Sequence, residues 1–163
     1  DTATSDFAAG QVLGRLGANK YLLDYVCERL GVVATMIAIQ MWNVKWPKAT
    51  AKLIEDKANG PAVIQLLRNQ VPGLIPVQPE GGKVSRAYAA QPEVEAGNVY
   101  LPHPHLAAWV PGFVANCAAF PNAAHDDDVD AFTQAIIRWQ GHNQMAAAPA
   151  QVVSQTTIRE MFG

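Results

Sequence analysis

The first pattern of apolar residues along the chain has a period of two and predicts strands. Residues 7–16 and 20–28 alternate in this way, and the Gly-Ala-Asn turn at 17–19 tolerates positive φ, so together they predict a β-hairpin. In the second strand, alternation places Tyr21, Leu23, Tyr25 and Cys27 on one face and Leu22, Asp24 and Val26 on the other. Since two strands alone are marginally stable, the hairpin is expected to belong to a larger sheet.

Three further segments are short, apolar and bounded by turn residues, as strands within a sheet are. They lie at 51–56, 74–77 and 98–101. The first carries apolar side chains on both faces, which is typical of a central parallel strand. It ends in Glu55 and Asp56, after which Asn59 or Gly60 can cap a helix that has Pro61 in its first turn.

The second pattern has the helical spacing of three to four residues. It predicts helices at 33–46, after Pro61, at 83–90, at 106–120 and at 126–139. The residues expected to face the core are Val33, Ile37, Met41 and Val44 in the first helix, Val63, Leu66 and Leu67 in the second, and Phe132, Ile136 and Trp139 in the last. Pro92 is expected to break the third helix, with a separate helical turn ending at Gly97, and Pro111 to kink or reset the fourth.

Strands that alternate with helices after an opening hairpin predict an α/β domain with a mixed sheet. We place this domain at residues 1–140 and interpret 141–163, which is rich in Ala and Gln, as a C-terminal tail or linker. In open α/β sheets, ligands bind beyond the carboxyl ends of the strands. Polar residues that follow a strand are therefore the first candidates for a site.

Composition narrows the class of protein. Half of the 163 residues are apolar and 16% are charged, which indicates a globular chain. The formal net charge of -2 argues against binding nucleic acid by bulk charge, but bound cations could reverse the sign locally. No signal peptide is visible, and the apolar run at 32–41 is too short to span a membrane. The isolated Cys27 and Cys117 are typical of reduced core residues in a cytosolic protein.

Acidic residues are concentrated where the last predicted helix begins. Four acids occupy a segment of five residues: Asp126, Asp127, Asp128 and Asp130. One or two of them are explained as capping residues, because the N–H groups and dipole of a helix N-terminus favour negative charge. Four exceed that requirement, so a cation is expected beside them. The cluster by itself leaves both interpretations open.

Glu55 is the second candidate, because an acid at the carboxyl end of a buried strand can point into the crevice of an α/β sheet. The alternative is that Glu55 simply marks the exit of the strand into solvent. If Glu55 and the Asp cluster converge, their oxygen atoms suit Mg²⁺ or Mn²⁺. Two such ions about 4 Å apart can activate a water and stabilise the leaving oxygen of a phosphodiester.

Other polar residues make weaker candidates. His103, His105 and His125 lie in predicted loops and are interpreted as surface residues. Lys57, Lys83 and Arg86 could face phosphate, although solvated charge is the usual role of such residues. The chain contains no phosphate-binding P-loop, no dinucleotide-binding glycine motif and no serine-hydrolase or zincin motif, so those activities have no support.

Several segments, taken in order, resemble the C-terminal nuclease domain of tailed-phage terminase large subunits. They are Leu53 to Gly60, Gly82 to Ala87, Glu95 to Pro102, Phe120-Pro121 and His125 to Ala131, together with Asp6-Phe7 and the hairpin that follows. The similarity runs from about Asp1 to Trp139. It rests on the order and spacing of the segments more than on any single motif.

The resemblance implies an RNase H-like fold, a mixed β-sheet flanked by helices, and a two-metal endonuclease that uses Mg²⁺ or Mn²⁺. By position, Glu55 would be the acid of the central strand, Asp126 and Asp127 the acids at the final helix, and Asp130 an accessory or structural acid. The substrate would be concatemeric double-stranded DNA in the cytoplasm of a phage-infected or prophage-carrying bacterium. An ATPase domain of the same polypeptide, the portal and the small terminase subunit would be partners, with no membrane involved.

One departure from the family concerns its first catalytic Asp, which lies on a strand before the segment that resembles residues 1–7. That strand is expected to be missing here, and neither Asp1 nor Asp6 convincingly replaces the acid. The chain is therefore expected to bind metal weakly and to cut poorly. A non-catalytic DNA-binding or assembly module of the same fold remains the alternative, as does another RNase H-like enzyme such as a resolvase or transposase.

Overall fold

The computed structural model describes residues 7–123 and 125–142. Its helices and strands are, in order, β1 (Phe7–Leu16), β2 (Asn19–Arg29), α1 (Val32–Lys45), β3 (Lys52–Glu55), α2 (Gly60–Leu67), β4 (Leu74–Val77), α3 (Lys83–Glu95), β5 (Val99–Tyr100), α4 (Val110–Ala119) and α5 (Asp127–His142). The strand–helix alternation and the mixed α/β class predicted from the sequence are confirmed. No helix within the described ranges is long and apolar enough to cross a membrane.

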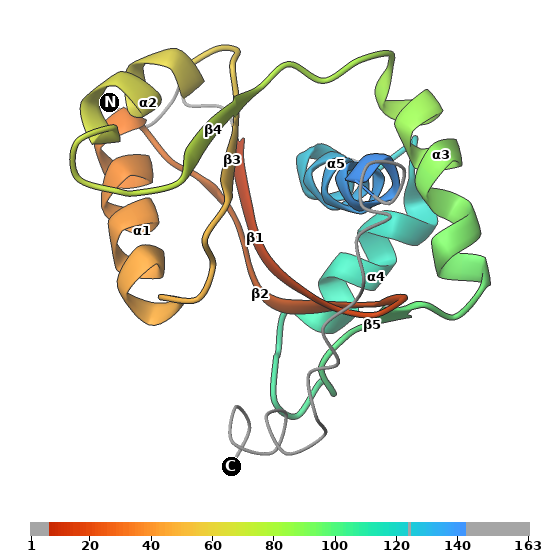
Figure 1. Ribbon diagram of the computed structural model, residues 1–163. Helices are drawn as coiled ribbons and strands as arrows, with labels where there is room; N and C mark the ends of the chain where they lie inside the picture. Colours follow the sequence, from red (N-terminus) through yellow and green to blue (C-terminus); the bar gives the residue numbers. More distant parts are fainter. Residues whose placement is uncertain (1–6, 124, 143–163) are drawn as a thin grey trace.

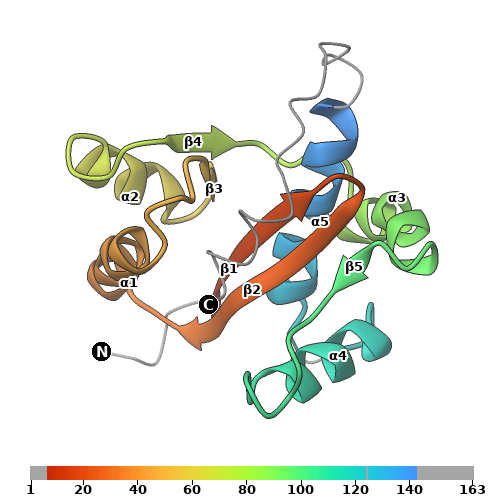
Figure 2. The same cartoon turned by 60° about the horizontal axis from the view of Figure 1, so that its bottom comes forward.

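The strands form two sheets, which lie next to each other. In the first, β1 pairs antiparallel with β2, and β5 pairs parallel with the other edge of β2. In the second, β3 pairs parallel with β4. Figures 1 and 2 both show the succession β4, β3, β1, β2, with α1 and α2 beside the β3–β4 sheet and α3, α4 and α5 together on the opposite side. Within the described residues, β1 and β3 each keep one edge that pairs with no strand.

The predicted hairpin is confirmed, but the residues that share each face of its second strand differ from those expected. The register passes from Val12 opposite Asp24 to Leu13 opposite Leu22, so Leu23 is an extra residue in β2 and forms a β-bulge. An extra residue reverses the alternation of side chains. Leu22 therefore shares a face with Tyr25 in the main core, and the prediction that it lies with Asp24 and Val26 is wrong.

The two faces of the hairpin pack against different helices. Leu22 lies in a core cluster with Phe113 of α4 and with Phe132 and Ile136 of α5. The other face meets α1, where the Asp24 carboxylate accepts hydrogen bonds from Lys45 Nζ at 2.7 Å and Trp46 Nε1 at 2.9 Å. Burial alone would raise the pKa of Asp24, but these hydrogen bonds outweigh it and the pKa falls below its usual value. The bulged hairpin thus packs against α4 and α5 with one face and against α1 with the other.

Helix α1 has the predicted length but not the predicted orientation. Its stripe of Val33, Ile37, Met41 and Val44 is exposed, at 70%, 51%, 66% and 79% respectively. The residues that pack against the β3–α2 core are instead Val32, Met36 and Ile39. Because α1 is apolar all round, its sequence alone does not identify the buried side, and the prediction of a buried stripe is wrong.

Three smaller predictions are also corrected. In α2, Val63 and Leu67 are buried as expected, but Leu66 is 52% exposed. Pro92 lies inside α3, which continues unbroken from Lys83 to Glu95. The missing N–H of a proline costs one bond to the carbonyl four residues earlier, here that of the exposed Tyr88, which solvent can reach. Helix α4 begins at Val110, with Pro111 in its first turn, where proline is well tolerated.

The C-terminal helix extends slightly further than predicted. Helix α5 begins at Asp127 and passes Gly141 to end at His142. The predicted tail from residue 143 onward lies outside the described residues, as do Asp1 and Asp6. Cys27 and Cys117, expected to be reduced core residues, are both free and half-buried.

Candidate functional site

The four acids at the start of α5 lie in two different environments. Asp128 is fully buried and Asp130 is 5% exposed. The side chains of Asp126 and Asp127 keep 35% and 42% of their surface exposed. The helical turn separates them in this way because Val129, Phe132 and Ile136 fix the face of α5 that enters the core. The acid cluster is therefore a buried pair and an outward-facing pair.

Asp128 has a structural role. Its Oδ2 accepts a hydrogen bond from the Tyr25 hydroxyl at 2.8 Å and another from Asn116 Nδ2 at 2.9 Å. Its main-chain carbonyl accepts a third from Gln11 Nε2 at 2.8 Å. Burial, and then the hydrogen bond to this carboxylate, raise the pKa of Tyr25, so the hydroxyl remains a donor at neutral pH. Asp128 thus connects α5 to β1, β2 and α4.

Replacing Tyr25 with phenylalanine is expected to destabilise the domain by about 1–3 kcal/mol, because a buried carboxylate loses one of its donors. Tyr88→Phe is the matched control, since the Tyr88 side chain is 70% exposed and its loss of a hydroxyl should change stability little. Urea unfolding curves of the two variants measure the difference. Equal midpoints would show that the Tyr25 hydroxyl contributes nothing to the fold.

Asp130 is paired with a buried arginine. Arg86 of α3 donates from Nε to Oδ1 and from Nη2 to Oδ2, each at 2.8 Å, which is the two-pronged geometry that guanidinium and carboxylate favour. Arg86 Nη1 also donates to the carbonyl of Gly81 at 2.7 Å. Arg86 is only 9% exposed, so it is not a solvated surface charge. Nor is its guanidinium free to contact phosphate. The Asp130 oxygens are occupied by Arg86 and, at 3.2 Å, by Gln134.

Asp126 and Asp127 share one cation. Lys83, the first residue of α3, donates from Nζ to Asp126 Oδ1 at 2.7 Å and to Asp127 Oδ1 at 2.9 Å. Burial alone would lower the pKa of Lys83, but the hydrogen bonds to the two carboxylates outweigh it and the pKa rises. The ammonium is therefore charged at neutral pH. It lies where two outward carboxylates converge, which is how hard oxygen ligands approach a divalent ion.

Glu55 lies on the face of β3 that is directed toward α3 and α5. It shares that face with Leu53, since side chains alternate along a strand. Leu53 lines a cavity of about 510 Å³ whose other walls include Arg86 of α3 and Ile137 of α5. The Glu55 side chain is 44% exposed, and its Oε1 lies 3.6 Å from Lys57 Nζ. Glu55 thus lies on the same side of β3 as α3 and α5, and its carboxylate is accessible to solvent.

The loop after Glu55 is held tightly against the end of β3. A Cβ atom at Gly60 would lie 1.8 Å from the main-chain oxygen of Glu55, so no other residue fits there. Asn59 precedes α2 as predicted, although its side chain accepts no capping hydrogen bond from the first turn of the helix. The glycine lets the first turn of α2 begin directly behind Glu55.

The four residues predicted to bind metal, Glu55, Asp126, Asp127 and Asp130, are not gathered into one cluster. Across residues 7–123 and 125–142, no three His, Cys, Asp or Glu side chains lie close enough together to hold a metal ion. Asp126 and Asp127 do converge, and the ammonium between them demonstrates that the pair accepts a cation. The donor set of this pair, two carboxylates with accessible oxygens, fits a divalent ion such as Mg²⁺ or Mn²⁺. Glu55 lies apart from the pair at the end of β3.

The histidines behave mostly as surface residues. His103 and His105 are exposed, and their rings stack on each other at 5.0 Å. His125 is exposed beside the acid cluster, and its ring lies 3.8 Å from that of Phe7 on β1. This contact brings the first described residue of the hairpin next to the start of α5.

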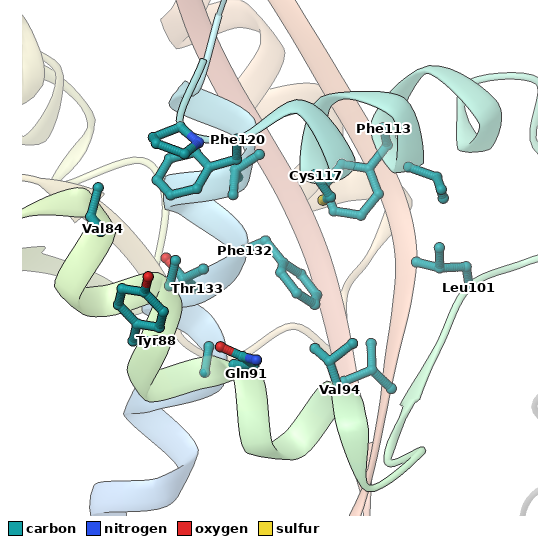
Figure 3. Close-up of a pocket in the computed structure, with 16 residues that line it drawn as sticks. Val84, Tyr88, Gln91, Val94, Leu101, Phe113, Cys117, Phe120, Phe132 and Thr133 are labelled. Carbon is teal, nitrogen blue, oxygen red and sulfur yellow. The ribbon is translucent and has the colours of Figure 1, made fainter. Parts of the chain in front are cut away.

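A second cavity lies between α3, α4 and α5, with a volume of about 480 Å³. Figure 3 shows that apolar side chains surround it, among them Val84, Val94 and Phe132. Among the described residues, no charged side chain lines it, and burial raises the pKa of Cys117 in its wall to about 11, so the thiol is neutral. The described wall of this cavity therefore offers no carboxylate that could hold a metal ion.

The partners of Asp128 were not identified from the sequence. Tyr25 precedes Asp128 by 103 residues, and Gln11 precedes it by 117. A single tyrosine or glutamine in an amphipathic strand carries no signal of such a contact. The three-residue spacing of Lys83 and Arg86 does match that of Asp127 and Asp130, and this was the available signal for the ion pairs that these residues form.

A comparison with family models agrees with this arrangement. The model described as terminase RNaseH-like domain matches residues 1–138, a span that includes every described strand, Glu55 and the acids of α5. Among curated proteins, no match to the chain was found. The family match covers most of the 163 residues and agrees with the mixed α/β fold. The chain belongs to the terminase RNaseH-like domain family.

Proposed function

We propose that this domain is a metal-dependent endonuclease that cuts concatemeric double-stranded DNA during phage genome packaging. Membership of the terminase family supports a nuclease-type module. The observation that carries the proposal furthest is the outward pair Asp126 and Asp127, whose carboxylates share one cation while Asp128 and Asp130 are buried in other contacts.

The residues proposed to hold Mg²⁺ or Mn²⁺ are Glu55, Asp126 and Asp127. When bound, two such ions supply an activated water and a positive charge at the leaving oxygen of the phosphodiester. The contribution of Glu55, Asp126 and Asp127 would be negatively charged carboxylates at fixed positions. Asp126 and Asp127 are fixed by the helix that Asp128 and Asp130 anchor in the core, and Glu55 is fixed by the strand end behind which α2 begins.

Asp130 is assigned a structural role in this proposal rather than that of a ligand. Its carboxylate is 5% exposed and already receives two hydrogen bonds from Arg86. Displacing that guanidinium would leave a second buried charge without a partner. Asp130 and Arg86 instead fix the relative position of α3 and α5, and so the distance between Lys83 and the outward acids.

The proposed context is that of a packaging motor. Double-stranded DNA would be the substrate, and an ATPase domain of the same polypeptide, the portal and the small terminase subunit would be partners. Such a complex would work in the cytoplasm of a phage-infected or prophage-carrying bacterium. The net charge of -2 indicates that bound metal or a partner must supply positive charge where DNA approaches.

A plasmid-nicking assay in Mn²⁺ tests the proposal. Glu55→Gln and Asp127→Asn should each abolish Mn²⁺-dependent nicking, because each removes a negatively charged ligand but keeps the size of the side chain. Glu80→Gln is the matched control, since Glu80 is an exposed acid in the loop between β4 and α3. The assay uses this chain and, where the gene encodes residues before Asp1, that longer polypeptide as well. Nicking that persists in both site variants would refute the nuclease assignment.

A non-catalytic assembly or DNA-binding module of the same fold is the second candidate. It is favoured by the absence of a three-ligand cluster on the described residues. The two candidates differ in their response to metal, because a ligand that binds the folded state raises its melting temperature. A non-catalytic module should show no Mn²⁺-dependent rise that requires Glu55 or Asp127.

A further inference from the structure

We propose that Lys83 is a resident counter-cation of the site, which occupies the shared position between Asp126 and Asp127 and competes with the divalent ion for it. This inference rests on the proposed function and concerns how the site is regulated. It goes beyond the ligand set, because Lys83 is not itself a ligand for a metal.

The geometry is that of a cation bound by two carboxylates. Lys83 Nζ lies 2.7 Å from Asp126 Oδ1 and 2.9 Å from Asp127 Oδ1, one oxygen of each acid. Two adjacent aspartates repel each other when both are ionised, and a single ammonium between them relieves that repulsion. A divalent ion at the same position would relieve it as well. The two cations therefore favour the same arrangement of the acids and exclude each other from it.

Of the two cations beside the acid cluster, Arg86 and Lys83, Lys83 is the one that can exchange with a metal ion. Arg86 is committed to Asp130 and to the carbonyl of Gly81, and it is buried. Asp128 receives its donors from Tyr25 and Asn116. Lys83 is different because its side chain is 36% exposed, so it can leave the acids and become solvated without unfolding the helix.

Release of Lys83 is possible because it lies at an end of its helix. It is the first residue of α3 and follows Gly82, so its side chain contributes little to the core. A lysine side chain has a flexible stem of four carbons and a strongly hydrated ammonium group. It gains rotamer freedom when it leaves the two carboxylates. Metal binding thus exchanges the two ion pairs of Lys83 for metal–carboxylate interactions and a solvated ammonium.

Titration of the chain with Mn²⁺ alone, followed by calorimetry and by the melting temperature, tests this competition. Lys83→Met should lower the Kd for Mn²⁺ about tenfold, equivalent to about 1.4 kcal/mol, since it removes the cation that has to leave Asp126 and Asp127 before the ion can bind them. Lys83→Gln should lower the Kd for Mn²⁺ in the same way, so the competition can still be tested if one of the two variants folds poorly. Lys83→Arg should bind Mn²⁺ as weakly as the wild type, because it keeps the charge.

Lys48→Met is the matched control, because Lys48 is an exposed lysine in the turn before β3 and its loss changes the net charge equally. Asp127→Asn reports on the site itself. If Asp127→Asn abolishes Mn²⁺ binding but Lys83→Met leaves the Kd unchanged or weakens it, the competition is refuted and the metal site stands. If Lys83→Met and Lys48→Met tighten binding equally, net charge is the cause and the competition is again refuted. If neither the wild type nor any variant responds to Mn²⁺, the proposed function and this inference both fail.

Discussion

Replacing Arg86 with methionine is expected to destabilise the domain by about 3–5 kcal/mol, which is the usual cost of leaving a buried charge without its partner. The Asp130 carboxylate would remain in the core at 5% exposure with Gln134 as its remaining side-chain donor. The carbonyls of Gly81 and Glu80 would lose a donor too. Guanidinium chloride unfolding, with the slope compared between variants, measures the change.

Two further variants separate charge from packing. Arg68→Met is the matched control, because Arg68 is exposed at the end of α2 and its loss should change stability by less than about 0.5 kcal/mol. The double variant Arg86→Met with Asp130→Leu should recover most of the loss, since apolar replacement of a whole buried ion pair is often neutral. If the double variant is as unstable as the single one, the cost comes from packing and the interpretation as an unpaired charge is wrong.

Ile136→Ala is expected to cost about 2–5 kcal/mol, because Ile136 is fully buried in the cluster that joins α5 to β2 and α4. Ile37→Ala makes the same chemical change in α1, where the side chain is 51% exposed. It should change stability by less than about 0.5 kcal/mol, and alanine's higher helix propensity favours both variants equally. Thermal unfolding followed by circular dichroism compares the two.

This pair of isoleucines tests a specific point, because helical spacing predicted burial for both. A large loss for Ile37→Ala would mean that the α1 stripe is covered in solution, for example by another chain. A small loss for Ile136→Ala would mean that the core around α5 can collapse into the vacated volume. The expected contrast, a large and a negligible effect, agrees with the exposure that the structure assigns to the two side chains.

Local sequence patterns predicted the type and order of the elements well. The hairpin, the strands ending at Glu55 and Val77, and the helix after the Asp cluster all lie where periodicity and turn residues placed them. These features depend on neighbours in the sequence, so they can be derived from it. The side of α1 that is buried depends on Trp42 and Trp46 meeting the hairpin, which no spacing along α1 indicates.

The site was predicted in part, for a related reason. A surplus of acids at a helix start predicted a cation beside them, and the ammonium of Lys83 lies there. The divalent metal at this position stays a prediction. The pattern of acids by itself did not distinguish the outward pair from Asp128 and Asp130, because that distinction depends on which turn of α5 enters the core. Only the family resemblance separated Asp126 and Asp127 from Asp130. The sequence also did not indicate that Tyr25, more than a hundred residues away, would be a partner of Asp128.

The extra residue at Leu23 restricts how this domain can vary over evolution. Val12 and Leu13 lie on either side of the bulge, which places Leu22 and Tyr25 on the same face of the hairpin, against one core cluster. Loss of one residue from β2 would turn Tyr25 away from Asp128 and bring Asp24 into the apolar layer. Exchanging one side chain for another in this hairpin is therefore a milder change than altering its length, and homologous chains should conserve the number of residues between positions 22 and 25 more strictly than their identity.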